Sequence, residues 1–356
     1  MDDDIFYGMR KYIPGTNKKK ILLHRASIDY YMEYLKKNNV RYSYINKNFD
    51  RVNNNKFMMY RPYDKELEYR YDKTIFIDNP NFILTHEELE YYYEKTKNNI
   101  KHIQQNFFKY VKNKIHFLEN IPSQDKYNRE RMKVKLEPNY KLNFDEDIKY
   151  IDKFRKVIDR KYSDNIGDVN DFIFPVTHKT AKNSFKKFIK YKLTMFGKYQ
   201  DYIDVNNMLL YHSGLSTVIN IGLINPNYIL KYLRKIEGKV DNNNIEGYVR
   251  QLFGWREYQR FIYHFYYDKI TNINIFNHSK KLSNGWYSGN VGNTVVDNMI
   301  NNGIHYGYLH HIIRLMIIGN YMNLNEIHPY ECYRWFQSKG LQASRSWNFP
   351  QIHTIG

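Results

Sequence analysis

The sequence predicts a short α/β segment followed by a larger region built only of helices. The apolar run KILL at 20–23 precedes a helical pattern, and the alternating RYSYI follows at 41–45, which together indicate strand, helix and strand. A further strand candidate, TIFID, lies at 74–78. From Thr85 onward amphipathic helical stretches dominate, separated by Pro, Gly and Asn.

The individual elements rest on spacing and on end signals. Ile28, Tyr31, Met32 and Leu35 recur at helix spacing, and Thr85 is a typical N-cap for the helix that begins HEELEYYYE. Charged and turn-forming residues cluster without periodicity between 127 and 145. We therefore expect one domain over 1–130 and a second over 131–356. The Asn runs at 53–55 and 242–244 are expected to be loops.

Composition limits the function classes. The 356 residues carry 55 Lys and Arg against 37 Asp and Glu, a formal net charge of +18 that favours polyanions such as nucleic acid. Codon bias in an AT-rich genome explains the same lysines equally well. The single cysteine, Cys332, excludes an internal disulfide framework and indicates a reducing compartment. The N-terminus lacks a secretory pattern and no apolar run reaches the roughly 18 residues of a membrane span, so we expect an intracellular soluble protein.

A candidate phosphate site lies in the segment 196–226. This segment begins with a Gly turn and ends in a helix predicted to start near Ser213 or Ser216. Free backbone amides and the helix dipole make such an N-terminus suitable for a phosphate or pyrophosphate. The alternative is that these hydroxyl residues only cap the helix.

A buried arginine is predicted in the stretch 247–264. Val249, Phe253, Arg256, Arg260 and Tyr263 fall on one helical stripe, so Arg256 continues an otherwise apolar face. A buried guanidinium needs a partner, because an isolated buried charge is very costly. That partner is either a polar ligand or a carboxylate in a core salt bridge.

Two histidines and an arginine crowd one region of the stretch 306–320. His310 and His311 precede Arg314 by four and three residues, and histidine suits proton transfer near neutral pH. Neither histidine has a His, Cys or carboxylate three or four residues further on, so we predict no metal site. A purely structural histidine pair is the alternative.

Several long motifs occur in one order and together resemble a known family. They are FPVTHKTAKNSFKKFI, FGKYQDYID, YHSGLS, NIGLINP, GYVRQLFGWREY and GYLHHIIRLMIIGN. From about residue 20 to 336 the chain is similar to the iron-sulfur bacterial group of photolyases and cryptochromes, which includes enzymes acting on pyrimidine-pyrimidone photoproducts.

The resemblance implies a fold and a chemistry. The fold is a partial Rossmann-like antenna domain followed by an all-α domain that binds FAD, with DNA across the pocket mouth. The chemistry is light-driven electron transfer from reduced flavin to a damaged dinucleotide flipped out of the duplex. The residues implied to bind FAD are Tyr202, Ser213, Leu215, Ser216, Trp255 and Arg256. Those implied to line the lesion site are His310, His311 and Arg314, whose histidines would protonate the photoproduct.

The chain also departs from the family pattern. It starts after the family's first strand and helix, so we expect a truncated antenna domain and no assured antenna pigment. A cubane cluster needs four thiolates, and the family's first cluster cysteine aligns with Val295, so we predict no iron-sulfur cluster. Gln342 stands where a family aspartate is expected near the flavin. A complementing polypeptide that supplies the missing C-terminal region is a further expectation.

Three functions remain open at this point. The first is a flavoenzyme that repairs ultraviolet photoproducts in DNA. The second is a truncated, non-catalytic relative that binds DNA through its basic surface. The third is a cryptochrome-like light sensor that signals through flavin redox change.

Overall fold

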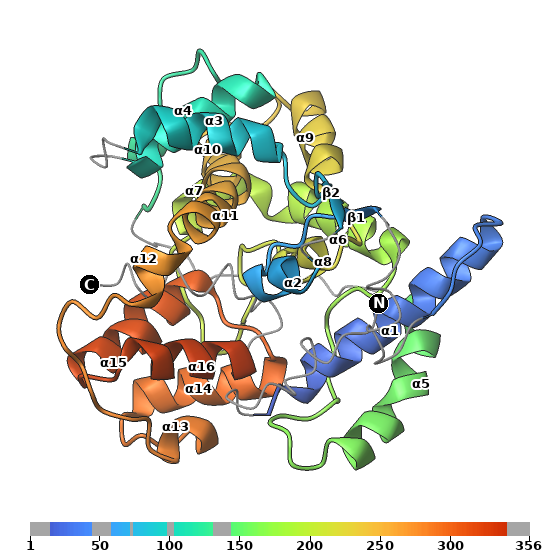
Figure 1. The fold of residues 1–356 in the computed structure, drawn as a ribbon, viewed down its shortest axis with the longest axis vertical. Coiled ribbons are helices and arrows are strands. Elements are labelled where there is room, and N and C mark those ends of the chain that lie inside the picture. Colours follow the sequence, from blue (N-terminus) through green and yellow to red (C-terminus); the bar gives the residue numbers. More distant parts are fainter. Residues whose placement is uncertain (1–14, 45–57, 72–73, 98–102, 131–143, 340–356) are drawn as a thin grey trace.

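The computed structural model describes residues 15–44, 58–71, 74–97, 103–130 and 144–339. Within these ranges the chain is mostly helical (Figure 1). The elements are α1 (Lys18–Lys37), β1 (Met58–Tyr60), α2 (Lys65–Arg70), β2 (Ile75–Ile77), α3 (His86–Thr96), α4 (Ile103–Ile115), a 3₁₀ turn (Asp125–Tyr127), α5 (Asp145–Lys161), α6 (His178–Tyr191), α7 (Leu193–Tyr199), α8 (Ser216–Asn220), α9 (Pro226–Lys235), α10 (Asn242–Val249), a π-helical turn (Arg250–Trp255), α11 (Arg256–Phe265), α12 (Tyr267–Thr271), α13 (Gly285–Ser288), α14 (Thr294–Tyr306), a second π-helical turn (Ile313–Gly319), α15 (Asn320–Leu324) and α16 (Pro329–Lys339).

The strand–helix–strand prediction for residues 20–45 is wrong. Residues 20–23 belong to α1, whose N-cap Asn17 accepts a hydrogen bond from the Lys19 backbone amide. Ile21, Leu22 and Ala26 are fully buried on this helix, and residues 41–44 form no strand. A short apolar run fits a strand and a buried helix equally well, and the cap with its helical continuation decided the outcome.

The second strand prediction is confirmed in position. β1 and β2 pair in parallel, with Met59 opposite Phe76. A pair of three-residue strands is the whole sheet among the described residues. Two short parallel strands are compatible with a remnant of an α/β domain, and they do not by themselves establish a Rossmann-like one.

The end of α3 follows the predicted capping chemistry, whereas one expected loop is helical. The Thr85 side chain accepts from the Glu88 amide, and the Glu88 carboxylate accepts from the Thr85 amide, a reciprocal capping box. The Asn run at 242–244 is the first turn of α10, which lies in a buried part of the molecule. Tertiary burial overrides the weak helix propensity of Asn at this place. The Asn run at 53–55 lies outside the described residues.

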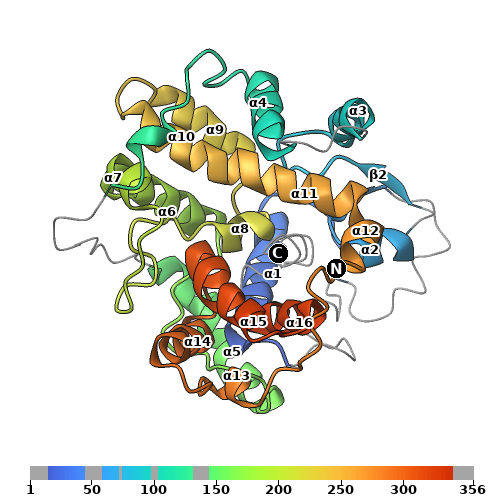
Figure 2. The same ribbon diagram turned by 90° about the vertical axis from the view of Figure 1, so that its left-hand side faces the viewer.

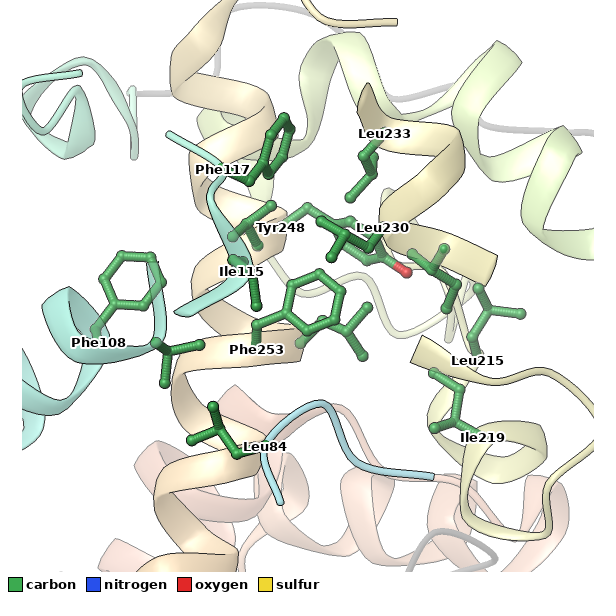
Figure 3. Packing of buried hydrophobic residues seen from close by; sticks show 14 of the residues in the cluster. Leu84, Phe108, Ile115, Phe117, Leu215, Ile219, Leu230, Leu233, Tyr248 and Phe253 are labelled. Carbon is green, nitrogen blue, oxygen red and sulfur yellow. The ribbon is translucent and has the colours of Figure 1, made fainter. Parts of the chain in front are cut away.

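The largest hydrophobic core joins segments from both predicted domains. Leu84 and Phe108, from the N-terminal third, belong to one buried cluster with Leu215, Leu230 and Phe253. Figure 3 shows these side chains gathered around the long helical run that continues from α10 into α11. The division at residue 130 remains a prediction, and α3 and α4 pack as part of the helical region.

Two smaller cores complete the molecule. One lies between α1 and α5, where Ile21 and Leu22 pack with Tyr150 and Ile151. The other holds α13, the α14 helix, α15 and α16 together around Trp335. Figures 1 and 2 show α8 near the middle of the molecule, between the α9–α11 group and the α13–α16 group. No helix in the described part of the chain has the length and apolar character of a membrane crossing.

Candidate functional site

The predicted histidine pair sits at a turn between two helices. α14 ends at Gly307, whose left-handed backbone (φ 64°) reverses the chain direction. His310 lies in the following turn, and His311 opens the helical run that becomes the second π-helical turn. The backbone amide of Arg314 donates to the His310 carbonyl at 3.0 Å. The structure therefore brings His310, His311 and Arg314 together as predicted, with His310 before the helix and not on it.

A third histidine joins this pair from a distant part of the chain. His212 is 98 residues from His310, and the Nε2 atoms of the two rings are in contact. Their ring centroids are 3.5 Å apart, and those of His310 and His311 are 4.6 Å apart. One ring nitrogen from each of the three histidines lies within 4.8 Å of the others. We call His212, His310 and His311 the histidine triad.

The backbone surrounds the triad with both donors and acceptors. Nδ1 of His212 lies 3.1 Å from the Leu209 carbonyl, and its Nε2 lies 2.6 Å from the Gln200 carbonyl. Nδ1 of His310 accepts a hydrogen bond of 3.1 Å from the Ile312 amide. The triad therefore has fixed ring orientations, which a catalytic or binding group requires.

Burial and neighbouring cations keep the triad neutral. Desolvation lowers the pKa of His212 to about 3, and it lowers the pKa of His310 well below its ordinary value. Desolvation, followed by the charges of Arg314 and Arg129, also lowers the pKa of His311, although 27% of that side chain is exposed. One carboxylate, Asp201, lies 3.8 Å from Nε2 of His311.

Three imidazoles are also a possible donor set for a transition metal, and two features of the triad disfavour one. A neutral histidine that binds a metal through Nε2 carries its proton on Nδ1, whereas Nδ1 of His310 accepts from the Ile312 amide. Three cationic side chains, Arg129, Lys192 and Arg314, act on these rings electrostatically, which opposes a dication. The absence of a metal site stays a prediction.

The segment predicted to bind phosphate adjoins the triad. Ser213 follows His212 directly, and Gly214 adopts the left-handed conformation (φ 65°) before Leu215 caps α8. The Ser213 side chain interacts with the buried hydroxyl of Tyr248 in α10. α8 does begin at Ser216, but it has only five residues. Its dipole is therefore small, and any binding here depends on side chains and individual amides.

Arg256 has partners of a kind that the sequence did not indicate. Its side chain is buried, donates to the Asn81 carbonyl and to Oδ1 of Asn220 at 3.4 Å, and lies 4.2 Å from the centroid of the Phe82 ring. Among the described residues no carboxylate is within ion-pair distance of it. Asn220 ends α8, so Arg256 ties α11 to the same short helix that Ser216 begins.

The remaining predicted cofactor residues occupy the neighbouring elements. Trp255 is half-buried beside Tyr258, with ring centroids 6.0 Å apart, and Leu215 is buried in the largest core. The hydroxyl of Tyr202 donates to the Glu130 carbonyl at 3.1 Å. Two buried acceptors in this region, Oε1 of Gln200 and Oε1 of Gln259, have no hydrogen-bond partner in the described residues. Buried acceptors without donors fit a polar group such as the flavin or adenine of FAD.

Sequence reasoning missed two residues of this site, His212 and Asp201. Both lie inside motifs that were noticed, YHSGLS and FGKYQDYID, but no local spacing connects them with His310 and His311. The adjacency of His212 to a predicted phosphate-binding serine was the one available signal. Gln342 lies outside the described residues, and Cys332 is buried with its pKa raised to about 12 by desolvation.

Comparison with known proteins places these observations in a family. No family model matches the chain. A (6-4) photolyase of Agrobacterium fabrum is 34% identical over 181 residues, which are 50% of this chain and 36% of that protein. An uncharacterized protein of Acanthamoeba polyphaga mimivirus is 39% identical over 115 residues, which are 31% of this chain and 85% of that protein.

The fold agrees with solved structures of the same group. A bacterial class III photolyase from Agrobacterium tumefaciens matches with a TM-score of 0.64 and 15% identity, over 96% of this chain and 71% of that one. A Synechocystis cryptochrome matches with a TM-score of 0.63 and 13% identity, over 99% and 74% of the two chains. Neither the relatives nor the structure supports the expected complementing polypeptide. The sequence match and the shared fold together establish that the chain belongs to the photolyase/cryptochrome family.

Proposed function

We propose that this protein is a photolyase-type flavoprotein that repairs ultraviolet photoproducts in DNA. The observation that carries the proposal is the histidine triad, which places proton-transfer groups directly beside the serine-bearing turn before α8. A repair site of this kind needs a cofactor-binding segment and a proton donor next to each other. The (6-4) photolyase relative supports the choice of reaction.

The cofactor in this proposal is FAD, which would supply light-driven electron transfer. Ser213 and Ser216 hydroxyls and the amides around Gly214 would hold its phosphates, because hydroxyls and amides donate to phosphate oxygens. Trp255 and Leu215 would bound the ring system, and Tyr202 would close the loop side. Oε1 of Gln259, which has no donor in the described structure, would accept from a polar edge of the cofactor. Arg256 would contribute by fixing α11 against α8.

The protein residues that would meet the lesion are His310, His311 and Arg314. His311 is the most exposed of the three, and Arg314 is buried with its pKa lowered to about 10 by desolvation. Arg314 would attract an extruded, negatively charged dinucleotide. We keep the absence of an iron-sulfur cluster as a prediction, because the chain has one cysteine and a cubane needs four thiolates.

The experiment that tests the proposal is the visible absorption spectrum of the purified protein with and without added FAD. Structured flavin bands that stay with the protein through gel filtration are expected. The same measurement on Ser213→Ala should show weaker retention, whereas Ser163→Ala, which changes an exposed serine, should behave as the unchanged protein. A flavin-loaded protein that fails to repair irradiated DNA under light would contradict the repair proposal.

A second candidate function is DNA binding without catalysis, which the net charge of +18 favours. A protein that stays colourless with FAD but binds duplex DNA in a salt-sensitive way would be of this kind. A flavoprotein that is photoreduced and does not repair DNA would instead be the cryptochrome-like sensor.

A further inference from the structure

The hydrogen bonds around the histidine triad fix where its protons lie. Nδ1 of His310 accepts from the Ile312 amide, so the proton of the neutral His310 ring is on Nε2. That proton points at Nε2 of His212. If Nε2 of His212 also carried a proton, two donors would face each other. Nε2 of His212 is therefore an acceptor.

The other nitrogen of His212 agrees with this assignment. A neutral His212 whose Nε2 accepts has its proton on Nδ1, and Nδ1 faces the Leu209 carbonyl at 3.1 Å, an acceptor. The Gln200 carbonyl, 2.6 Å from Nε2 of His212, also takes part in binding the His310 proton. The chain of donors thus runs in one direction, from the Ile312 amide through His310 and His212 to the Leu209 carbonyl.

His311 differs from the two locked rings. It is the only member of the triad with substantial exposure, and its Nε2 faces the carboxylate of Asp201 at 3.8 Å. The charged groups near it are Arg314 on its own helical run, Arg129 from the segment before α5, and Asp201 from the loop after α7. Asp201 is itself paired with Arg129 at 2.7 Å. Lys192 lies on the far side, where it donates to the His212 carbonyl.

We infer that His212 is a positioning residue that locks His310 as the neutral Nε2–H tautomer, and that His311 is the ring of the triad that exchanges protons. The tautomer assignment holds for the protein by itself, and the delivery of the proton to a DNA lesion rests on the proposed function. Asp201 favours the protonated form of His311, whereas burial and the absence of a carboxylate partner oppose protonation of His212 and His310.

The test is imidazole ¹⁵N NMR of the full chain labelled at histidine, recorded without FAD or DNA across the range from pH 8 to pH 5. His310→Gln and His311→Gln assign the signals. Unchanged protein should show His310 as the Nε2–H tautomer throughout, and His311 should be the first of the three to protonate as the pH falls. His310 appearing as the Nδ1–H tautomer, or protonating before His311, would overturn the inference.

Substitution of His212 separates positioning from a merely structural role. His212→Gln keeps an acceptor oxygen near the position of Nε2, so the His310 tautomer should persist. His212→Leu removes the acceptor, so the His310 signal should lose its single-tautomer pattern, while His116→Gln, at an exposed site, should leave it unchanged. Identical His310 spectra in the Gln and Leu variants would contradict the positioning role. Stoichiometric binding of added Zn²⁺ that shifts all three rings would contradict it as well.

A repair assay then tests the part that depends on the proposed function. The acid limb of the repair–pH profile should move in His212→Leu and remain near its original place in His212→Gln. A protein without repair activity leaves the NMR result intact, so failure of the proposed function and failure of the tautomer assignment are distinguishable.

Discussion

Arg256 illustrates how this protein accommodates a buried cation without a carboxylate. Its guanidinium donates to one backbone carbonyl and one side-chain amide and lies over an aromatic ring. Burial lowers its pKa to about 10, so it remains charged at neutral pH. The neighbouring Glu257 instead accepts from the Ile83 amide and lies 3.6 Å from Arg260. Both sequence alternatives for Arg256 assumed a partner that the described structure does not supply.

Replacing Arg256 by Ala should destabilise the protein by about 2–4 kcal/mol, because it removes charge-assisted hydrogen bonds and leaves the Asn81 carbonyl without its donor. Urea unfolding measures the change, with Arg160→Ala at an exposed position as the control. Undiminished stability together with complete loss of flavin retention would contradict a structural role and place the arginine at the cofactor.

The stability of this protein should also depend on its buried histidines. Desolvation lowers the pKa of His264 to about 2, whereas an unfolded histidine titrates near 6.5. Between these values the unfolded state binds more protons, so this contribution to stability is present above about pH 6.5 and is lost as the pH falls below it.

His264→Phe should therefore reduce the loss of unfolding free energy between pH 7.5 and pH 5 by about 2 kcal/mol, on the basis of 1.36 kcal/mol per pH unit. The comparison uses chemical denaturation of both proteins at the two pH values, and it cancels the carboxylates that titrate in both. An equal pH dependence in the two proteins would show that His264 titrates normally in the fold.

At the scale of elements, helix ends were more predictable than element types. The capping box at Thr85 followed from residue chemistry alone, because a hydroxyl that satisfies a free amide needs no tertiary partner. The run at 20–23 did not, because its apolar residues serve a buried helix against α5 as well as they would serve a strand. The five-residue α8 was correctly placed, but its length was not evident from the sequence.

Replacing Thr85 by Ala should cost about 1 kcal/mol of stability, the usual effect of losing a side-chain N-cap. Thr96→Ala is the matched control in the same helix, because the Thr96 hydroxyl only bonds back to the Tyr92 carbonyl. Thermal or urea unfolding of the two variants gives the comparison. A larger loss at Thr96 than at Thr85 would show that the capping box does not stabilise α3.

At the scale of the whole molecule, three cores hold together segments that are far apart in the sequence. The largest core includes residues on both sides of position 130, so the folded unit around α8 depends on α3 and α4 as well as on the later helices. The surface carries a large excess of positive charge, which acts on partners at long range and is independent of these packing details.

Binding to a random-sequence DNA duplex should weaken steadily with salt, with log K falling linearly against log of the salt concentration. Fluorescence anisotropy between low and physiological ionic strength measures the slope. A measurable affinity that does not change with salt would contradict an electrostatic interface, and no binding at low salt would contradict any role for the net charge in DNA binding.

The sequence by itself determined the features that depend on local chemistry. It indicated the predominance of helix, the Thr85 cap, the helix start at Ser216, the burial of Arg256 and the closeness of His310 to His311, because each follows from neighbouring residues within a few positions. The family resemblance supplied the expected fold, which the solved structures bear out for the helical part.

Only the tertiary structure decided the features that need distant segments to meet. It brought His212 into contact with a residue 98 positions away, set Asp201 beside His311, and gave Arg256 a carbonyl partner from the loop before α3. These contacts depend on how the chain reverses at Gly307 and on which helices share a core. Local periodicity sets which face of a helix is buried, but it carries no information about the partner that buries it.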